Sequence, residues 1–63
     1  MEEMKLVFQQ EFHVDNKNIV GKIEKDENNF YIAIYENNKE IKRKLYNGSL
    51  DDYSMIAEME NFI

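Results

Sequence analysis

The sequence contains no cysteine and only one histidine, His13. Disulfides are therefore excluded, and so are the thiolates and paired imidazoles from which protein zinc sites are usually built. A chain of 63 residues buries only about 60% of the surface that its unfolded form exposes, so we expect marginal stability. The remaining ways to add buried area are oligomerisation and folding against a partner. We predict a single domain over residues 1–63 that holds no metal and no other cofactor.

The chain also lacks a targeting signal and a long hydrophobic run. Its first residues include Glu2 and Glu3, where a secretory signal would be basic. Its longest apolar run, residues 30–35, is far shorter than the roughly 20 residues of a membrane-spanning helix. Together with the absence of cysteine, these features predict a soluble cytoplasmic protein.

No arrangement of residues in the sequence is typical of a catalytic site. Asp51 and Asp52 are neighbours, so in a helix they would point about 100° apart and could not act as a carboxylate pair. His13 has Asp15 two residues along the chain, on a strand surface that offers no cleft. The only two glycines cannot form a glycine-rich phosphate-binding loop. We therefore predict that the protein is not an enzyme.

Alternation of apolar and polar residues predicts four β-strands, at residues 4–14, 19–25, 30–36 and 39–46. Clusters rich in Asp and Asn separate them, and Asn37-Asn38 fits a two-residue hairpin loop because Asn tolerates the left-handed region. Ser49 is the expected N-cap of a helix over residues 50–62. The predicted fold is α+β, a four-stranded antiparallel β-meander followed by one C-terminal α-helix packed on one face.

The strand periodicity also predicts which side chains form the core. In the fourth strand, Ile41 and Leu45 are expected to face the core, with Lys42, Lys44 and Tyr46 on the opposite face. The whole predicted core, closed by part of the helix, is Leu6, Phe8, Phe12, Ile23, Phe30, Ile32, Ile34, Ile41 and Leu45.

Apolar residues cover more of the predicted helix than one sheet can bury. One sector holds Leu50, Tyr53, Ile56 and Ala57, and a second sector, nearly opposite Leu50, holds Met55, Met59 and Phe62. A single sheet requires an apolar stripe of somewhat more than 100°, and this helix offers roughly twice that. We predict that Met55, Met59 and Phe62 form a homodimer interface, because Met suits adaptable surfaces and two-fold dimers are common. The alternative is that the end of the helix curls into the core.

The negative charge is concentrated at the C-terminal end of the chain. The net charge is −5, and residues 51–63 contain four acidic residues, Asp51, Asp52, Glu58 and Glu60, and no basic residue. Such a surface can steer association with a basic protein. We predict that these four residues bind a larger protein and that the chain is a small acidic interaction module. It would act as a homodimeric inhibitor or regulator, of a kind common among phage and mobile-element products. A simpler interpretation is a solvated helix face.

An alternative function is binding of single-stranded nucleic acid on the open face of the sheet. Tyr31, Tyr35 and Tyr46 would stack on bases, and Lys42 and Lys44 would contact phosphates. The acidity of the whole chain argues against this function, and ordinary cross-strand pairing would also produce such a face. The acidic helix gives no attraction to anionic lipid, so no membrane partner is expected.

Overall fold

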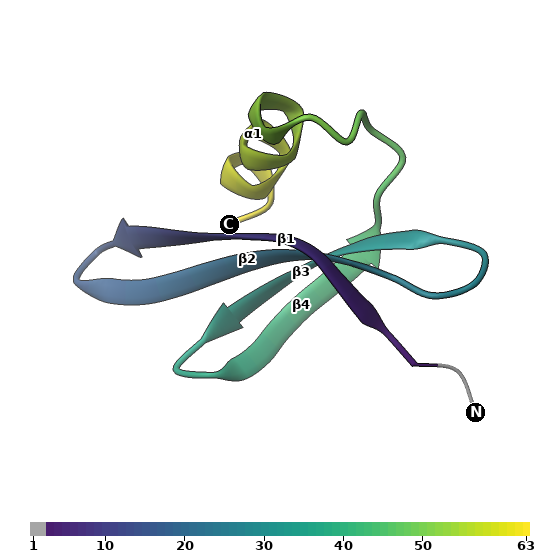
Figure 1. Cartoon of the computed structure of the whole chain (residues 1–63). Helices are drawn as coiled ribbons and strands as arrows, with labels where there is room; N and C mark the ends of the chain where they lie inside the picture. The colour runs from purple at the N-terminus through teal and green to yellow at the C-terminus, as the bar shows by residue number, and fades with distance from the viewer. Residues whose placement is uncertain (1–2) are drawn as a thin grey trace.

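A computed structural model describes residues 3–63, and its four strands form one antiparallel sheet in the order β1-β2-β3-β4 (Figure 1). The elements are β1 Lys5–Val14, β2 Lys17–Lys25, β3 Phe30–Glu36, β4 Lys39–Leu45 and α1 Asp52–Phe62. The predicted α+β meander with one C-terminal helix is confirmed, and each predicted boundary lies within two residues of the observed one. Within residues 3–63, no helix is long and apolar enough to cross a membrane.

Two of the hairpins turn on pairs of residues in the left-handed region. Asp15 and Asn16 have φ angles of 50° and 64°, and Asn37 and Asn38 have φ angles of 54° and 65°. Two consecutive left-handed residues define the type I′ turn, whose twist matches that of the flanking strands. The predicted Asn37-Asn38 hairpin is confirmed. Because the first hairpin needs only Asp15-Asn16, β2 begins at Lys17, two residues earlier than predicted.

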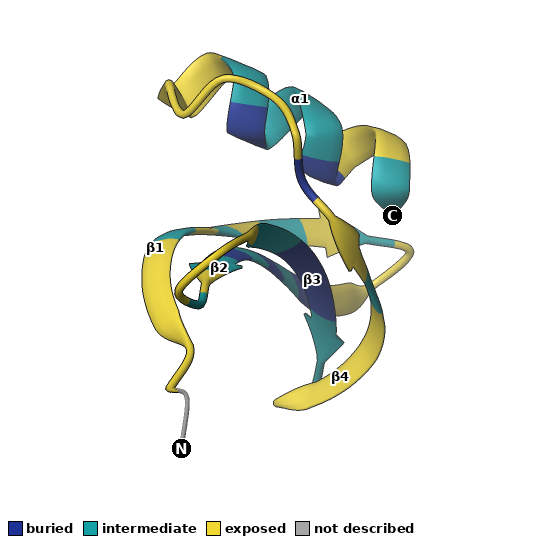
Figure 2. Cartoon of the chain, turned by 90° about the vertical axis from the view of Figure 1, so that its right-hand side faces the viewer, coloured by how far each residue is buried: buried dark blue, intermediate teal, exposed yellow. Residues whose placement is uncertain are grey.

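The core lies between α1 and the sheet face that it covers (Figure 2). Ile23, Ile32 and Met59 are completely buried there. Gly21 of β2 allows this close approach, because an added Cβ at this position would lie 2.6 Å from Met59 Sδ. The core cluster consists of Ile23, Ile32, Tyr46, Met55 and Met59, and partly buried Phe8, Phe12, Phe30 and Phe62 pack around it. Ile19, Ala33 and Ile34 are also buried.

The predicted orientation of β4 is wrong. Lys42 and Lys44 pair with the buried Ile34 and Ile32, so they share the face that packs against α1. Their ammonium groups lie 5.1 Å and 4.7 Å from the centre of the Phe62 ring. The aliphatic part of a lysine side chain can cover apolar surface while its ammonium group reaches water. Lys42 and Lys44 cover the edge of the core in this way. Leu45 consequently lies on the other face and is 54% exposed.

Two β-bulges explain why other predicted core residues are exposed. Val7 has no partner between the pairs Leu6–Glu24 and Phe8–Ile23, and Ile41 is the corresponding extra residue of β4. A bulge interrupts the alternation of faces and bends the strand. Leu6 therefore lies on the face away from α1, and it is 56% exposed, whereas Ile41 is 51% exposed. The expected burial of both residues is wrong.

The helix begins later than predicted, and with a different cap. The carboxylate of Asp51 accepts hydrogen bonds from the Ser54 backbone N–H at 2.9 Å and from the Ser54 hydroxyl at 3.0 Å. Asp51 is therefore the N-cap, a position at which Asp is among the preferred residues. The Ser49 carbonyl instead accepts a hydrogen bond from the Tyr46 hydroxyl, which ties the linker to the end of the sheet.

Candidate functional site

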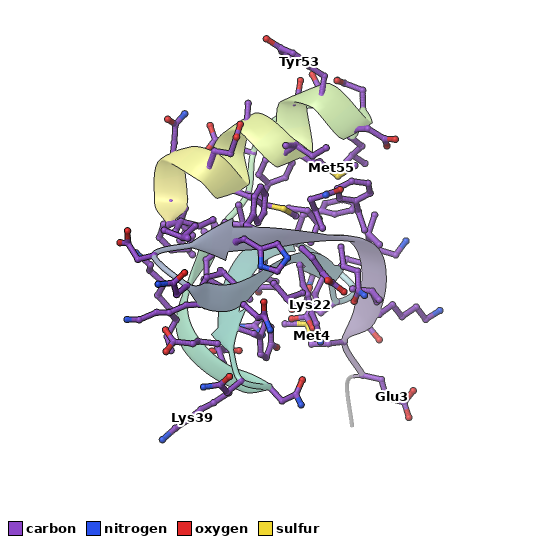
Figure 3. The ribbon with its side chains drawn as sticks, turned by 90° about the vertical axis from the view of Figure 1, so that its left-hand side faces the viewer. Glu3, Met4, Lys22, Lys39, Tyr53 and Met55 are labelled. Carbon is purple, nitrogen blue, oxygen red and sulfur yellow. The ribbon has the colours of Figure 1, made fainter. Side chains whose placement is uncertain are left out.

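Tyr53, on the outer side of α1, is the most exposed large hydrophobic residue of those that the structure describes. Met55 points from the helix towards the sheet and Tyr53 points away from the body of the protein (Figure 3). Met55 and Met59 are 3% and 0% exposed, whereas Tyr53 is 84% exposed. Leu50, just before the helix, is also half exposed. The outer surface of the helix therefore presents an exposed aromatic side chain, and an exposed leucine precedes the helix in the chain.

The predicted dimer residues do not form such a surface. Met55 and Met59 are buried in the core of one chain, and Phe62 is partly buried beneath Lys42 and Lys44. These side chains are therefore not free to contact a second copy. Met55 and Met59 face the sheet, whereas of the sector expected to face it Leu50 and Tyr53 are exposed and Ile56 and Ala57 are partly buried.

The predicted acidic residues are only partly equivalent in the structure. Asp51, Asp52 and Glu60 are exposed, but Glu58 is half-buried and its carboxylate lies 3.6 Å from Lys44 Nζ. The hydrogen bonds from Ser54 hold the pKa of Asp51 below its usual value, because they stabilise the ionised carboxylate. Within residues 3–63, no ion pair engages Asp51, Asp52 or Glu60. Asp51 and Asp52 lie next to Tyr53, whereas Glu60 is near the other end of α1, where it lines a hollow with Phe12 and His13 of β1.

Sequence reasoning missed Tyr53 and Leu50, which it placed among the residues facing the sheet. The signal that could have identified them is Gly21, where a strand without a side chain offers room for a long one. Met59 occupies that room, with its Cγ atom 2.8 Å from the position of an added Cβ. Once Met59 faces β2, Met55 must face it too because of the four-residue spacing, and Tyr53 must point outwards.

On the face opposite α1, charged side chains neutralise one another. Arg43 donates hydrogen bonds from Nη2 to Glu24 and to Glu40, each at 2.6 Å. The hydrogen bond from Arg43 lowers the pKa of Glu40. Lys22 Nζ lies 4.3 Å from the centre of the Tyr35 ring. The cations of this face are therefore already engaged by carboxylates and by an aromatic ring.

The structure does not bring the predicted nucleic-acid-binding residues together. The strand register puts Tyr31 and Tyr35 on the face opposite α1, whereas Lys42 and Lys44 lie on the α1 side. The sheet is curved, with its concave side away from α1 (Figure 2). Tyr46 is 4% exposed, and burial is the main cause that raises the pKa of its hydroxyl. Stacking and phosphate contacts thus cannot be made by these five residues on one face.

Comparison with protein families, curated proteins and solved structures found no match to this chain. Its function is therefore inferred from its own surface.

Proposed function

We propose that this protein is a non-enzymatic binding module that docks on a basic surface of a larger protein and thereby inhibits or regulates it. The docking surface is the outer side of the first turn of α1 with the residues just before it, called here the acidic surface: Leu50, Asp51, Asp52 and Tyr53. The observation that carries the proposal is the 84% exposure of Tyr53 beside the exposed carboxylates of Asp51 and Asp52.

Each part of the acidic surface suits a protein partner. Tyrosine is enriched among the residues that dominate binding energy, because it buries a large ring and keeps a polar end. The carboxylates increase the association rate with a cationic partner and discriminate against anionic ones. Solvation alone would account for the carboxylates, but it gives no reason for an aromatic side chain to project from among them.

The partner is expected to be a protein with a cationic pocket that accepts an aromatic ring. Arg or Lys side chains around such a pocket would contact both the face of the Tyr53 ring and the carboxylates of Asp51 and Asp52. Within α1 no basic residue competes for these contacts, since residues 51–63 contain no Lys or Arg.

A matched pair of charge reversals tests the proposal after partner capture from host lysate with and without nuclease. Asp52→Lys and Glu27→Lys change the net charge equally, but Glu27 lies exposed in the β2–β3 turn, outside the acidic surface. Binding of the captured protein should slow with Asp52→Lys at low salt and remain unchanged with Glu27→Lys.

Removal of the aromatic ring gives a second measurement. Tyr53→Ala should raise the Kd at least 10-fold, which corresponds to about 1.4 kcal/mol or more. Equal effects of the two charge reversals, together with an unaffected Tyr53→Ala, would refute the acidic surface as the binding site. Partners that are lost after nuclease treatment would instead direct attention to Tyr31 and Tyr35.

A further inference from the structure

The outer edge of β1 is the less protected of the two sheet edges. β1 and β4 are the edge strands, and among the described residues each pairs with a neighbour on one side only. β4 is rich in cationic residues, Lys39, Lys42, Arg43 and Lys44. Lysines on an edge strand oppose pairing with a further strand. β1 is ten residues long and contains one lysine, Lys5, and one carboxylate, Glu11, so charge gives it little protection.

The middle of β1 is symmetric in residue type. Residues 8–12 are Phe-Gln-Gln-Glu-Phe, which places a phenylalanine at each end and Gln10 at the centre. Phe8 and Phe12 pair with the buried Ile23 and Ile19, so both face the α1 side of the sheet, where they are only partly buried. Gln9 and Glu11 are exposed on the opposite face.

We propose that two copies of this protein pair through their β1 edges, antiparallel and about a two-fold axis at Gln10. Phe8 of each copy then lies opposite Phe12 of the other, and the Gln9 amide can donate a hydrogen bond to the Glu11 carboxylate of the other. The two four-stranded sheets become one continuous sheet with both helices on the same face.

Other alignments of the two strands are less complementary. An axis at Glu11 would place two carboxylates opposite each other, and an axis at Gln9 would place Phe8 opposite Gln10 of the second copy. A shift of one residue, with the axis between Gln9 and Gln10, would place Phe8 opposite Glu11 and turn the two helices to opposite faces. The Gln10 axis is the one of these four that matches apolar with apolar and amide with carboxylate.

This inference goes beyond the proposed function, because it concerns a second copy of the chain and a different surface. The purified protein alone is sufficient to test it. A failure of dimerisation would leave the acidic surface untouched, and a failure to bind a basic protein would leave the β1 pairing untouched.

The same substitution at two adjacent residues should have different effects on dimerisation, measured by sedimentation equilibrium. Gln10→Lys places two ammonium groups opposite each other at the axis, so the dimer Kd should rise at least 10-fold. Gln9→Lys places each ammonium group opposite Glu11 of the other copy, so the Kd should be unchanged or lower. A wild-type chain that remains a 7.6 kDa monomer, or equal weakening by both variants, would overturn the proposal.

Because the chain has no cysteine, single-cysteine variants report the alignment directly. Residues opposite each other in antiparallel strands have Cα atoms about 4.5–5.5 Å apart, within disulfide range, so Gln10→Cys should form a covalent dimer under mild oxidation. The control is His13→Cys, whose two copies would lie about 20 Å apart along the strands, from six steps of about 3.4 Å. Rapid cross-linking of Gln10→Cys alone supports the axis. Equal rates for the two variants, or no cross-linking of either, would exclude it.

Discussion

A methyl group added at Gly21 is expected to destabilise the protein, because α1 lies too close to β2 to admit it. The Cβ atom of Gly21→Ala would lie 2.6 Å from Met59 Sδ, 2.8 Å from Cγ and 3.2 Å from Cβ. Met59 is completely buried, so its side chain has no open space into which to move. Gly21 does not have a positive φ angle, so alanine is compatible with the backbone and the expected effect is steric.

The magnitude follows from two opposing terms. Overpacking of a well-filled core costs about 1–3 kcal/mol. Replacement of glycine by alanine at a compatible φ angle restores about 0.4–1 kcal/mol by restricting the unfolded chain. We expect a net loss of about 1–2 kcal/mol in the free energy of unfolding, or a Tm lower by about 4–16 °C for a domain of this size. Such a loss is a large fraction of the ~3–9 kcal/mol typical for 63 residues.

A double-mutant cycle with Met59→Ala tests whether the effect arises from this contact. Met59→Ala alone should lower the free energy of unfolding by about 2–5 kcal/mol. Urea unfolding of all four proteins is therefore measured in the same sucrose-containing buffer, because sucrose stabilises the folded state of the weakest variants. The double variant should be more stable than the sum of the single losses implies, by about 1 kcal/mol. Asn18→Ala, exposed on the same strand, should stay within about 0.5 kcal/mol of wild type. A Gly21→Ala variant as stable as wild type, or strict additivity, would refute the packing argument.

Two further predictions concern charged side chains. The pKa of Asp51 is lowered in the folded state by hydrogen bonds from Ser54, so its stabilisation is present above its unfolded pKa of about 3.9 and is lost as pH falls through the lower folded value. The urea midpoint of Asp51→Asn should therefore fall less than that of wild type between about pH 5 and about pH 2. Arg43→Met should cost about 1–3 kcal/mol in urea unfolding, because the largely buried Glu24 loses its cation. Adding Glu24→Gln should restore part of that loss, and no recovery would contradict the pairing.

The order and bounds of the elements could be predicted from the sequence because the relevant signals are local. Period-two alternation marks the strands, and the left-handed tolerance of asparagine marks the turn at Asn37-Asn38. Such signals depend on residues that are close in sequence, so they do not require knowledge of the tertiary contacts.

The facing of individual side chains was less predictable, because it depends on partners that are distant in sequence. A bulge at Val7 or Ile41 shows no clear local pattern, yet it reverses the face of the residues beyond it. The choice between the two apolar sectors of α1 was decided by Gly21, some forty residues earlier in the chain. Of the four acidic residues expected on the helix, Asp52, Glu58 and Glu60 lie in α1 and Asp51 is its N-cap, whereas Tyr53 was assigned to the wrong side.

The single helix α1 is too small to cover the whole face of the sheet, which explains why the β1 edge is incompletely covered. α1 has 11 residues, so it is about 16 Å long and about 10 Å wide. Four strands of 7–10 residues present a face about 19 Å wide and about 23–33 Å long, so the helix covers only about a third of it. Met59 packs against Gly21 of β2, which places the helix over that strand. Phe8 and Phe12 on the neighbouring β1 are therefore only partly buried. A second β1 with its own phenylalanines on the same face would extend the apolar layer across that edge, which links the small size of the chain to the proposed pairing.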